Sequence, residues 1–443
     1  MESEFFERFK NSSDWYNFTE DQKSFFEPFF NGDNIFLTGS AGVGKSYLLS
    51  KLFDFCESEN IHISKTSSTG ISALNIGGST IHSWLGIGTG EEHPDYLLEK
   101  LMHKKHVVDR IKNARVLILD EVSMISAILL GKIDYILRKV RKKEDKAFGG
   151  VQVILTGDAL QLPPVITDTK PENAKLVFFF NSPSWKMGNF KVIKLTTVMR
   201  QNDAEFANAL NLLRFGDTSQ ASIFNSCINK KVEESDVKPI ELLAKKYDVE
   251  KHNLRQLQKI LKPSKTFTAY DFGQNHHKQF FHKNCPASKE IELKEGAQVM
   301  LVYNLDISSG LVNGSMGVVE GFTGNNEVLV KFANGVATTI APVKWEIKEE
   351  RFVNGNHFYE TVAYRRQIPL KLAYAISIHK SQGQTLDKAV VDLTDIFSPG
   401  QAYVALSRVK SLDGLYIRNH NPHMLNPAIF KPHPEALKFY LSI

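Results

Sequence analysis

The sequence predicts an α/β protein with two domains built on parallel β-sheets and a small antiparallel β-barrel inserted in the second domain. Short apolar runs rich in β-forming residues recur between helical patterns, in one set within 1–195 and in a second set near the C-terminus. Strands of parallel sheets read as continuous apolar runs because helices cover both faces of such sheets. Closely spaced strands separated by Asn-Gly and Gly-Asn turns occupy 264–367 and are typical of antiparallel hairpins. We expect the first domain over 1–195, the second over 196–263 and 368–443, and the barrel over 264–367.

The apolar runs expected to form parallel strands are spread over most of the chain. In order, they are Ile61–Ser64, Val116–Leu119, Val151–Leu155, Val192–Leu195, Ala389–Leu393 and Leu415–Ile417, in addition to the run that begins at Asn34. In the inserted segment, the expected strands are Gly296–Val302, Leu311–Val319 and Val328–Phe332.

The composition is that of a soluble globular protein. The 443 residues predict two to four domains, because single cores rarely exceed roughly 250–300 residues. The longest apolar runs are too short to span a bilayer and the N-terminus is acidic and polar, so we expect an intracellular protein without membrane contact. Three widely separated cysteines argue against a disulfide framework and a four-ligand zinc site. The net charge of +5 permits a polyanionic partner without requiring one.

Residues Asn34–Leu49 predict a phosphate-binding loop between a strand and a helix. Such a loop presents backbone N–H groups, and the positive end of the helix dipole, to one anionic group. Lys45 can reach the β- and γ-phosphates of a nucleoside triphosphate, and the Ser46 hydroxyl can ligate Mg²⁺. The residues expected to hold the nucleotide here are Gly39, Gly42, Val43, Gly44, Lys45 and Ser46.

Gln22, just upstream of this loop, has two interpretations. Thr19 and Gln22 have the spacing of a capping box at a helix start, which is a structural role. A side-chain amide is both a donor and an acceptor, so it also suits the edge of an adenine. The residues alone do not favour either interpretation.

Asp120 and Glu121 follow the apolar run Val116–Leu119 directly. Ligands bind at the carboxyl ends of the strands in open α/β sheets, where this pair would lie. We expect Asp120 to hold Mg²⁺ together with Ser46, and Glu121 to polarise the water that attacks the γ-phosphate.

Three further polar residues are candidates for sensing the γ-phosphate. Gln161 follows another strand and precedes Pro163-Pro164, and a surface turn is the less favoured alternative for it. Arg200 and Arg408 are either surface ion-pair partners or guanidinium groups that the second domain supplies to the developing charge. Arginines beyond the first domain suggest an ATP site shared between two domains, as in a molecular motor.

Six segments together resemble the petite-integration-frequency (PIF) family of DNA helicases, which belong to superfamily one and are related to RecD. The resemblance runs from about Thr19 to about Ile417, in the family's order. The segments are Thr66–Ser83, Asp120–Met124, Thr156–Pro164, Leu311–Gly317, Ser377–Thr385 and Gln401–Arg408.

The resemblance implies two RecA-like P-loop domains, with a small wedge insertion at about 84–112 in the first and a Src-homology-like barrel in the second. It implies an enzyme that uses ATP and Mg²⁺ to translocate 5′ to 3′ along single-stranded DNA. Such enzymes unwind duplexes, forks, RNA–DNA hybrids or G-quadruplexes in DNA replication, repair or recombination. We accordingly expect single-stranded and forked DNA as partners, a monomer in solution, and action at sites of DNA replication.

The resemblance also assigns roles to residues. It implies that Gln22 reads adenine, that Gln161, Arg200 and Arg408 sense the γ-phosphate, and that Gly383 and Gln384 touch both nucleotide and DNA. The implied DNA contacts are Thr66, Ser67, Ser68, His82, His379, Lys380 and Ser381. Trp84 could stack on a base or be a core aromatic residue, and we favour the core role.

The chain departs from the family pattern in two respects. Ala159-Leu160 stands where family members often carry an aromatic pair, which puts the packing of that loop in question. The chain also begins close to the motor, so we expect it to lack the long N-terminal regions of eukaryotic members, as suits a bacterial, viral or mobile-element origin.

Two other functions remain as alternatives. One is an ATP-gated clamp on single-stranded nucleic acid that does not unwind, which the hydrolytic residues argue against. The other is an RNA-directed helicase of superfamily one.

Overall fold

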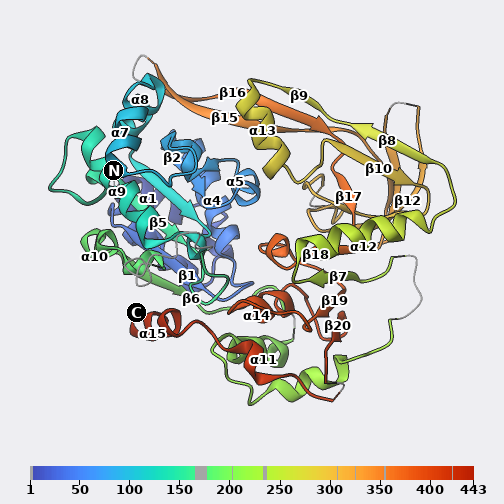
Figure 1. The fold of residues 1–443 in the computed structure, drawn as a ribbon. Coiled ribbons are helices and arrows are strands. Elements are labelled where there is room, and N and C mark those ends of the chain that lie inside the picture. The colour runs from blue at the N-terminus through green and yellow to red at the C-terminus, as the bar shows by residue number, and fades with distance from the viewer. Residues whose placement is uncertain are drawn as a thin grey trace. The chain divides into compact units, whose positions relative to one another are not determined.

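The computed structural model describes residues 3–164, 177–201, 203–232, 237–306, 308–324, 326–353, 356–421 and 423–443. The chain divides into two compact units (Figure 1). The first unit comprises Met1–Met199, Ile347–Thr361 and His433–Ile443, and the second comprises Arg200–Glu346 and Val362–Pro432. Among the described helices, none is both long and apolar enough to cross a membrane.

The first unit is built on a parallel sheet with the strand order β3-β2-β4-β5-β1-β6. Its strands are β1 (Ile35–Gly39), β2 (Ile63–Ser67), β3 (Ser79–Thr80), β4 (Val116–Asp120), β5 (Gln152–Thr156) and β6 (Lys191–Leu195). The central strands are buried along almost their whole length, which is why their sequences are continuous apolar runs.

Alternate residues of these strands enter two cores, one on each face of the sheet. Ile35 and Leu37 pack with the N-terminal phenylalanines, whereas Phe36 between them packs on the other face. The helices of this unit are α1 (Ser3–Lys10), α2 (Glu20–Lys23), α3 (Phe26–Phe30), α4 (Lys45–Ser58), α5 (Gly70–Asn75), α6 (Ile81–Leu85), α7 (Pro94–Met102), α8 (Lys105–Asn113), α9 (Ala127–Arg141), α10 (Pro183–Gly188) and α15 (Pro434–Ser442).

The segment expected to form a wedge, 84–112, contains helices α7 and α8, which pack against α9. Lys132 on α9 holds the loop before α7, because its ammonium donates to the carbonyls of Gly90 (2.7 Å) and Glu92 (2.8 Å). Trp84 is only 3 % exposed and belongs to this core, which confirms the interpretation as a core aromatic.

Two segments belong to the first unit although the sequence placed them elsewhere. The expected second domain included 433–443, but α15 packs Phe439 against the rings of Phe180 (4.0 Å) and Trp185 (5.4 Å). The expected barrel included 347–361, but there the Tyr359 hydroxyl donates to the Ile63 carbonyl at 2.8 Å. Both differences arise from contacts between residues far apart in sequence, which local patterns do not contain.

The second unit combines a parallel sheet, with the order β18-β7-β19-β20, and antiparallel sheets. The parallel strands and the helices of the unit are β7 (Ile240–Leu243), β18 (Ala375–Ser377), β19 (Ala389–Asp392), β20 (Leu415–Arg418), α11 (Ala204–Arg214), α12 (Lys246–Gln258), α13 (Asn275–Asn284) and α14 (Gln401–Leu406). This sheet confirms the predicted α/β class for the second half of the chain.

Antiparallel strands occupy the inserted segment, as the hairpin turns predict. They form the sheets β14-β13-β12-β11-β17, β15-β16-β9 and β10-β8. Their bounds are β8 (Ser264–Thr268), β9 (Tyr270–Phe272), β10 (Glu290–Lys294), β11 (Gln298–Leu301), β12 (Met316–Phe322), β13 (Val328–Phe332), β14 (Ala337–Ile340), β15 (Val343–Val353), β16 (Asn356–Gln367) and β17 (Leu370–Leu372). The last strand lies beyond the expected boundary at residue 367 because it pairs with β11.

Candidate nucleotide and nucleic-acid site

The phosphate-binding loop lies between the end of β1 and the start of α4, as the sequence predicts. Gly39 and Gly44 have positive φ values of 149° and 85°. A β-carbon on Gly39 would lie 2.4 Å from the Leu195 carbonyl oxygen, and one on Gly44 would lie 2.5 Å from Nε2 of Gln22. Both positions therefore require glycine, and the backbone N–H groups can turn toward one point at the helix N-terminus.

Lys45 is the first residue of α4, and its side chain folds back over the loop. Its Nζ donates to the carbonyls of Gly39 (2.8 Å) and Ser40 (2.9 Å). The ammonium group is thus held beside the loop whose backbone would bind phosphate. A compact cation in this position is suited to the β- and γ-phosphates.

Gln22 is fully buried and does what the capping box predicts. Its Oε1 accepts a hydrogen bond from the Thr19 backbone at 3.1 Å, which confirms the capping interpretation. Its Nε2 lies 3.4 Å from the Val43 carbonyl of the phosphate-binding loop. The side chain therefore ties helix α2 to the loop, and its reading of adenine stays a prediction.

Asp120 is the last residue of β4, and Glu121 adopts a left-handed conformation with φ 53° directly after it. A left-handed conformation is uncommon for a residue with a β-carbon, and it turns the chain sharply at the end of β4. Burial raises the pKa of Asp120, while hydrogen bonds from the Glu121 backbone and from Ser72, and the charge of Lys45, oppose that rise. Burial therefore disfavours the anion needed for Mg²⁺, and the neighbouring donors and the Lys45 charge offset part of that cost.

Ser72 is a residue that sequence reasoning missed. Its hydroxyl donates to Oδ2 of Asp120 at 3.1 Å from helix α5. Thr69 is the sequence feature that could have indicated Ser72. Its hydroxyl caps α5 by accepting from the Ser72 backbone, and this cap fixes where the helix begins.

We expect Ser72→Ala to lower kcat for ATP hydrolysis by roughly 10- to 150-fold, because a hydrogen bond to a charged group contributes about 1.5–3 kcal/mol. A steady-state ATPase assay measures this. Ser58→Ala is the matched control, since the Ser58 hydroxyl is exposed and donates to the Phe55 carbonyl of its own helix. Equal turnover in both variants would show that Ser72 does not orient Asp120.

The hydroxyl groups of Thr66, Ser67 and Ser68 bond to the strand that carries the carboxylates. They donate to the carbonyls of Ile118 (2.6 Å), Asp120 (3.2 Å) and Glu121 (2.9 Å), respectively. Thr66 and Ser67 are fully buried because β2 pairs with β4 at this point, so their side chains do not face a nucleic-acid strand as expected. Ser68 is half-buried, so its side chain and the backbone of 66–68 are the remaining candidates for a contact with nucleic acid.

Gln161 lies in the loop after β5 and is 8 % exposed. Its Nε2 lies 3.4 Å from Oδ2 of Asp158, whose Oδ1 accepts from the Leu160 backbone at 3.1 Å. The surface-turn alternative for Gln161 is therefore wrong. Ala159 and Leu160 are buried, so this loop packs with an apolar pair in place of aromatic residues.

Arg408 is only 1 % exposed, which excludes the surface ion-pair interpretation for that residue, and Arg200 is half-buried in the second unit. Nη1 of Arg200 donates to the Ser407 carbonyl at 3.0 Å, and Nη2 of Arg408 donates to the Ser407 hydroxyl at 2.7 Å. Burial lowers the pKa of Arg200. Both guanidinium groups are thus oriented by the residue that follows α14.

Gln384 has a buried side chain whose Oε1 has no hydrogen-bond partner among the described residues. It follows Gly383, whose φ of 77° provides a sharp turn. Buried polar atoms are normally paired, so an unpaired acceptor in a predicted binding motif is consistent with a bond to a ligand.

The remaining predicted DNA contacts differ in accessibility. Ser381 is buried and its hydroxyl donates to the Ile378 carbonyl at 2.8 Å, so its side chain has an internal partner. Burial lowers the pKa values of His379 and His82, which favours neutral rings that could stack on bases. His379 lies nearly parallel to Phe397, with the ring centroids 6.3 Å apart, and Phe397 is 65 % exposed.

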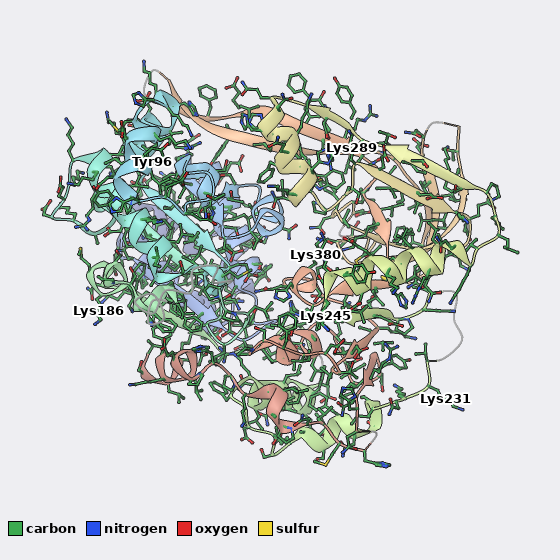
Figure 2. The ribbon with its side chains drawn as sticks, in the orientation of Figure 1. Tyr96, Lys186, Lys231, Lys245, Lys289 and Lys380 are labelled. Carbon is green, nitrogen blue, oxygen red and sulfur yellow. The ribbon has the colours of Figure 1, made fainter. Side chains whose placement is uncertain are left out.

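Lysines gather around Lys380 in the second unit. Figure 2 shows Lys380 and Lys245 on the same part of this unit, and the charge of Lys246 helps burial to lower the pKa of Lys380. Burial, with the charge of Lys380, also lowers the pKa of Lys371 to about 7. Sequence reasoning named only Lys380, because the other lysines lie on different elements. Closely placed cations of this kind suit a phosphate backbone.

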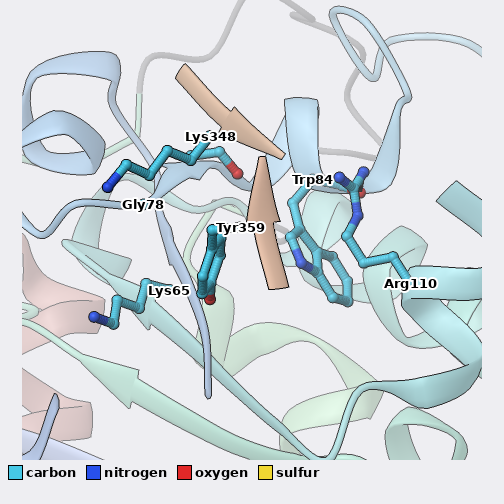
Figure 3. Close-up of a pocket in the computed structure, with 7 residues that line it drawn as sticks. Lys65, Gly78, Trp84, Arg110, Lys348 and Tyr359 are labelled. Carbon is cyan, nitrogen blue, oxygen red and sulfur yellow. Dashed lines mark hydrogen bonds between the residues drawn. The ribbon is translucent and has the colours of Figure 1, made fainter. Parts of the chain in front are cut away.

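A separate small pocket in the first unit contains none of the predicted site residues. Figure 3 shows its basic and aromatic lining, with Lys348 and Tyr359 contributed by strands β15 and β16. Its lining residues are Lys65, Gly78, Ser79, Trp84, Arg110, Lys348 and Tyr359. Elsewhere in the described residues, His, Cys, Asp and Glu side chains form no group of three that could hold a metal ion.

Comparisons with known protein families agree with this geometry. The family described as "PIF1-like helicase" matches residues 17–237, and "DNA helicase Pif1, 2B domain" matches residues 279–322. The chain is 39 % identical over 414 residues to the ATP-dependent DNA helicase PIF1 of Xenopus laevis, covering 93 % of this chain and 62 % of that protein. It is 33 % identical to the uncharacterized protein 030L of Invertebrate iridescent virus 6, covering 93 % of this chain and 91 % of the viral protein.

Solved structures are similar over the same length. Pif1 from a Bacteroides species in complex with ADP-AlF4 has a TM-score of 0.83 at 30 % identity and covers 96 % of each chain. Bacteroides Pif1 in complex with ADP-AlF3 and single-stranded DNA has a TM-score of 0.65 at 30 % identity, again over 96 % of each chain.

Proposed function

Because the chain belongs to the PIF1-like helicase family, we propose that it is an ATP-dependent DNA helicase. The chain spans about 62 % of the length of the Xenopus laevis relative, and its activity and partners are therefore inferred from the part that matches. We propose translocation 5′ to 3′ along single-stranded DNA, with unwinding of duplexes and forks during DNA replication, repair or recombination. RNA–DNA hybrids and G-quadruplexes are further substrates of the same activity.

The observation that carries this proposal is the continuity between the nucleotide side and the predicted DNA segment of the first unit. Lys45 folds back over the phosphate-binding loop, and Ser67 and Ser68 bond to the carbonyls of Asp120, the last residue of β4, and of Glu121, which follows it. A shift in the position of Asp120 or Glu121 during hydrolysis would therefore be transmitted to the 66–68 segment through these hydrogen bonds. A motor needs such a mechanical link, whereas a passive binding protein does not.

ATP and Mg²⁺ fit the residues present. The backbone of the Gly39–Gly44 loop would hold the phosphates, and the Ser46 hydroxyl and Asp120 carboxylate are the hard oxygen ligands that Mg²⁺ prefers. Mg²⁺ supplies neutralisation of phosphate charge when bound. Lys45 orients the terminal phosphates, and Glu121 accepts a proton from the attacking water.

The other predicted residues complete the proposal. Gln161 senses the γ-phosphate through its amide, and Arg200 and Arg408 of the second unit stabilise the charge that develops on it. Gln22 reads adenine, while Gly383 and Gln384 respond to nucleotide and DNA. The DNA contacts are Ser68, His82, His379 and Lys380, with the backbones of Thr66, Ser67 and Ser381.

A strand-displacement assay on tailed duplexes tests the proposal. We expect ATP- and Mg²⁺-dependent unwinding of 5′-tailed DNA, and little unwinding of 3′-tailed DNA. Binding without displacement would support the alternative of an ATP-gated clamp, and displacement of RNA duplexes alone would support an RNA-directed helicase. Unwinding of 3′-tailed DNA alone would contradict the proposed polarity.

A further inference from the structure

Strand β9 and the adjoining ends of β15 and β16, which belong to the second unit, carry a row of exposed aromatic side chains on the outer face of their sheet. Tyr270 and Phe272 on β9 are 60 % and 50 % exposed. Their pairing partners on β16 are Arg366 and Tyr364, respectively. The rings of Phe272 and Tyr364 are stacked, with centroids 5.2 Å apart and planes 22° apart. An exposed patch of large aromatic side chains indicates an interaction surface.

The inner face of the same strands is closely packed, which fixes the aromatic row on the outside. Arg365 is 1 % exposed and forms two hydrogen bonds of 2.7 Å to the carboxylate of Asp271. Nε2 of Gln367 donates to the carbonyl of Phe267 at 3.0 Å. Because side chains alternate between faces, these bonds hold Tyr270, Phe272 and Tyr364 in register on the opposite face.

Cations flank the aromatic row. Nζ of Lys344 on β15 lies 4.8 Å from the ring centroid of Tyr364, and Arg366 is exposed on β16. Two carboxylates share this face by alternation, Glu346 with Lys344 on β15 and Glu360 with Tyr364 and Arg366 on β16. The cations lie nearest to the rings, because Lys344 is beside Tyr364 and Arg366 pairs with Tyr270.

We propose that this aromatic face, formed by Tyr270, Phe272, Tyr364, Lys344 and Arg366, binds unpaired bases of single-stranded DNA by stacking. Sheet surfaces that carry aromatic rings beside Lys and Arg bind single strands this way, because every base has a flat π-face and every linkage a negative phosphate. The proposal rests on the proposed function for the presence of a single strand. It adds a contact outside the 66–68 and 379–381 segments.

The double variant Tyr270→Ala/Phe272→Ala tests the proposal in the full chain. We expect its affinity for a fluorescent oligothymidylate, measured by anisotropy, to fall by at least about fivefold, because stacking contributes to binding base by base. Tyr247→Ala is the matched control, since Tyr247 is 71 % exposed on α12 of the same unit. Tyr270→Trp/Phe272→Trp should retain the affinity, because tryptophan preserves a stacking surface.

Photocross-linking gives a second readout that does not depend on folding of a variant. An oligonucleotide carrying 5-iodouracil should cross-link the wild-type chain in the peptide that contains Tyr270 and Phe272. Unchanged affinity together with no cross-link in this peptide would overturn the proposal. Unchanged affinity with altered sedimentation of the alanine variant would instead assign the face to protein association, and would also overturn it.

The two proposals fail separately. If the wild-type chain unwinds tailed DNA but the peptide does not cross-link, only the aromatic face is wrongly assigned. If the peptide cross-links but the chain neither hydrolyses ATP nor displaces a strand, the helicase proposal fails and the binding face remains.

Discussion

Lys45→Ala is expected to lower DNA-stimulated ATP turnover by at least about a hundredfold. The reason is that removing a preorganised group that stabilises the transition state has an effect of this size in other enzymes. The Lys45 ammonium donates to the carbonyls of Gly39 and Ser40 in its own loop, at 2.8 and 2.9 Å. Its removal leaves the glycine turn and helix α4 intact, so folding should persist. Single-stranded DNA binding should stay within about twofold, because the DNA grip is a sum of backbone contacts elsewhere.

The control for Lys45→Ala is Lys51→Ala on the same helix. Lys51 pairs with Asp14 at 2.9 Å at a partly exposed position, so its loss should leave turnover unchanged. ATPase rates with and without oligothymidylate, and anisotropy titrations of the same samples, separate hydrolysis from binding. Persistent turnover of Lys45→Ala would show that the phosphate-binding loop is wrongly assigned.

The phosphate-binding loop could be predicted because its requirements are local. Gly39 and Gly44 need positive φ, and the charge of Lys45 needs to follow them on the first turn of a helix. The strands β4 and β5 were equally clear, since full burial gives an unbroken apolar run. Where chemistry depends on consecutive residues, sequence spacing is enough.

Residues whose roles depend on a neighbouring strand were harder to assign. The 66–68 hydroxyls were expected to contact DNA, yet Thr66 and Ser67 point into the sheet because β2 pairs with β4. Ser72 was missed because its bond to Asp120 joins residues 48 positions apart. A family motif indicates that a segment matters, but pairing decides which of its side chains can reach a ligand.

Unit boundaries failed for the same reason. Tyr359 follows residues of the inserted segment in sequence, but its hydroxyl bonds to Ile63 of the first unit. Phe439 near the C-terminus packs with Phe180 and Trp185, which are also aromatic residues of the first unit. Such packing is selected by shape and burial between distant segments, and a change in composition along the chain does not reveal it.

The largest expected loss of stability comes from Asp271→Ala. Asp271 is 8 % exposed and Arg365 only 1 %, and their two hydrogen bonds are both 2.7 Å long. Removing the carboxylate leaves a buried guanidinium without its anion, which costs about 3–5 kcal/mol in comparable proteins. Arg365 would keep its bonds to the carbonyls of Phe281 (3.3 Å) and Ala287 (3.1 Å), which carry no full negative charge.

Urea unfolding followed by hydrogen exchange measures this loss within the second unit, where the pair lies. Glu295→Ala is the matched control, because it breaks the exposed pair with Lys262 and should cost less than about 1 kcal/mol. The apolar double variant Arg365→Met/Asp271→Leu should recover most of the lost stability, since the desolvation of both charges disappears together. A loss for Asp271→Ala no greater than that of Glu295→Ala would mean that water reaches Arg365, and that the face beneath Tyr270 and Phe272 is not rigidly anchored.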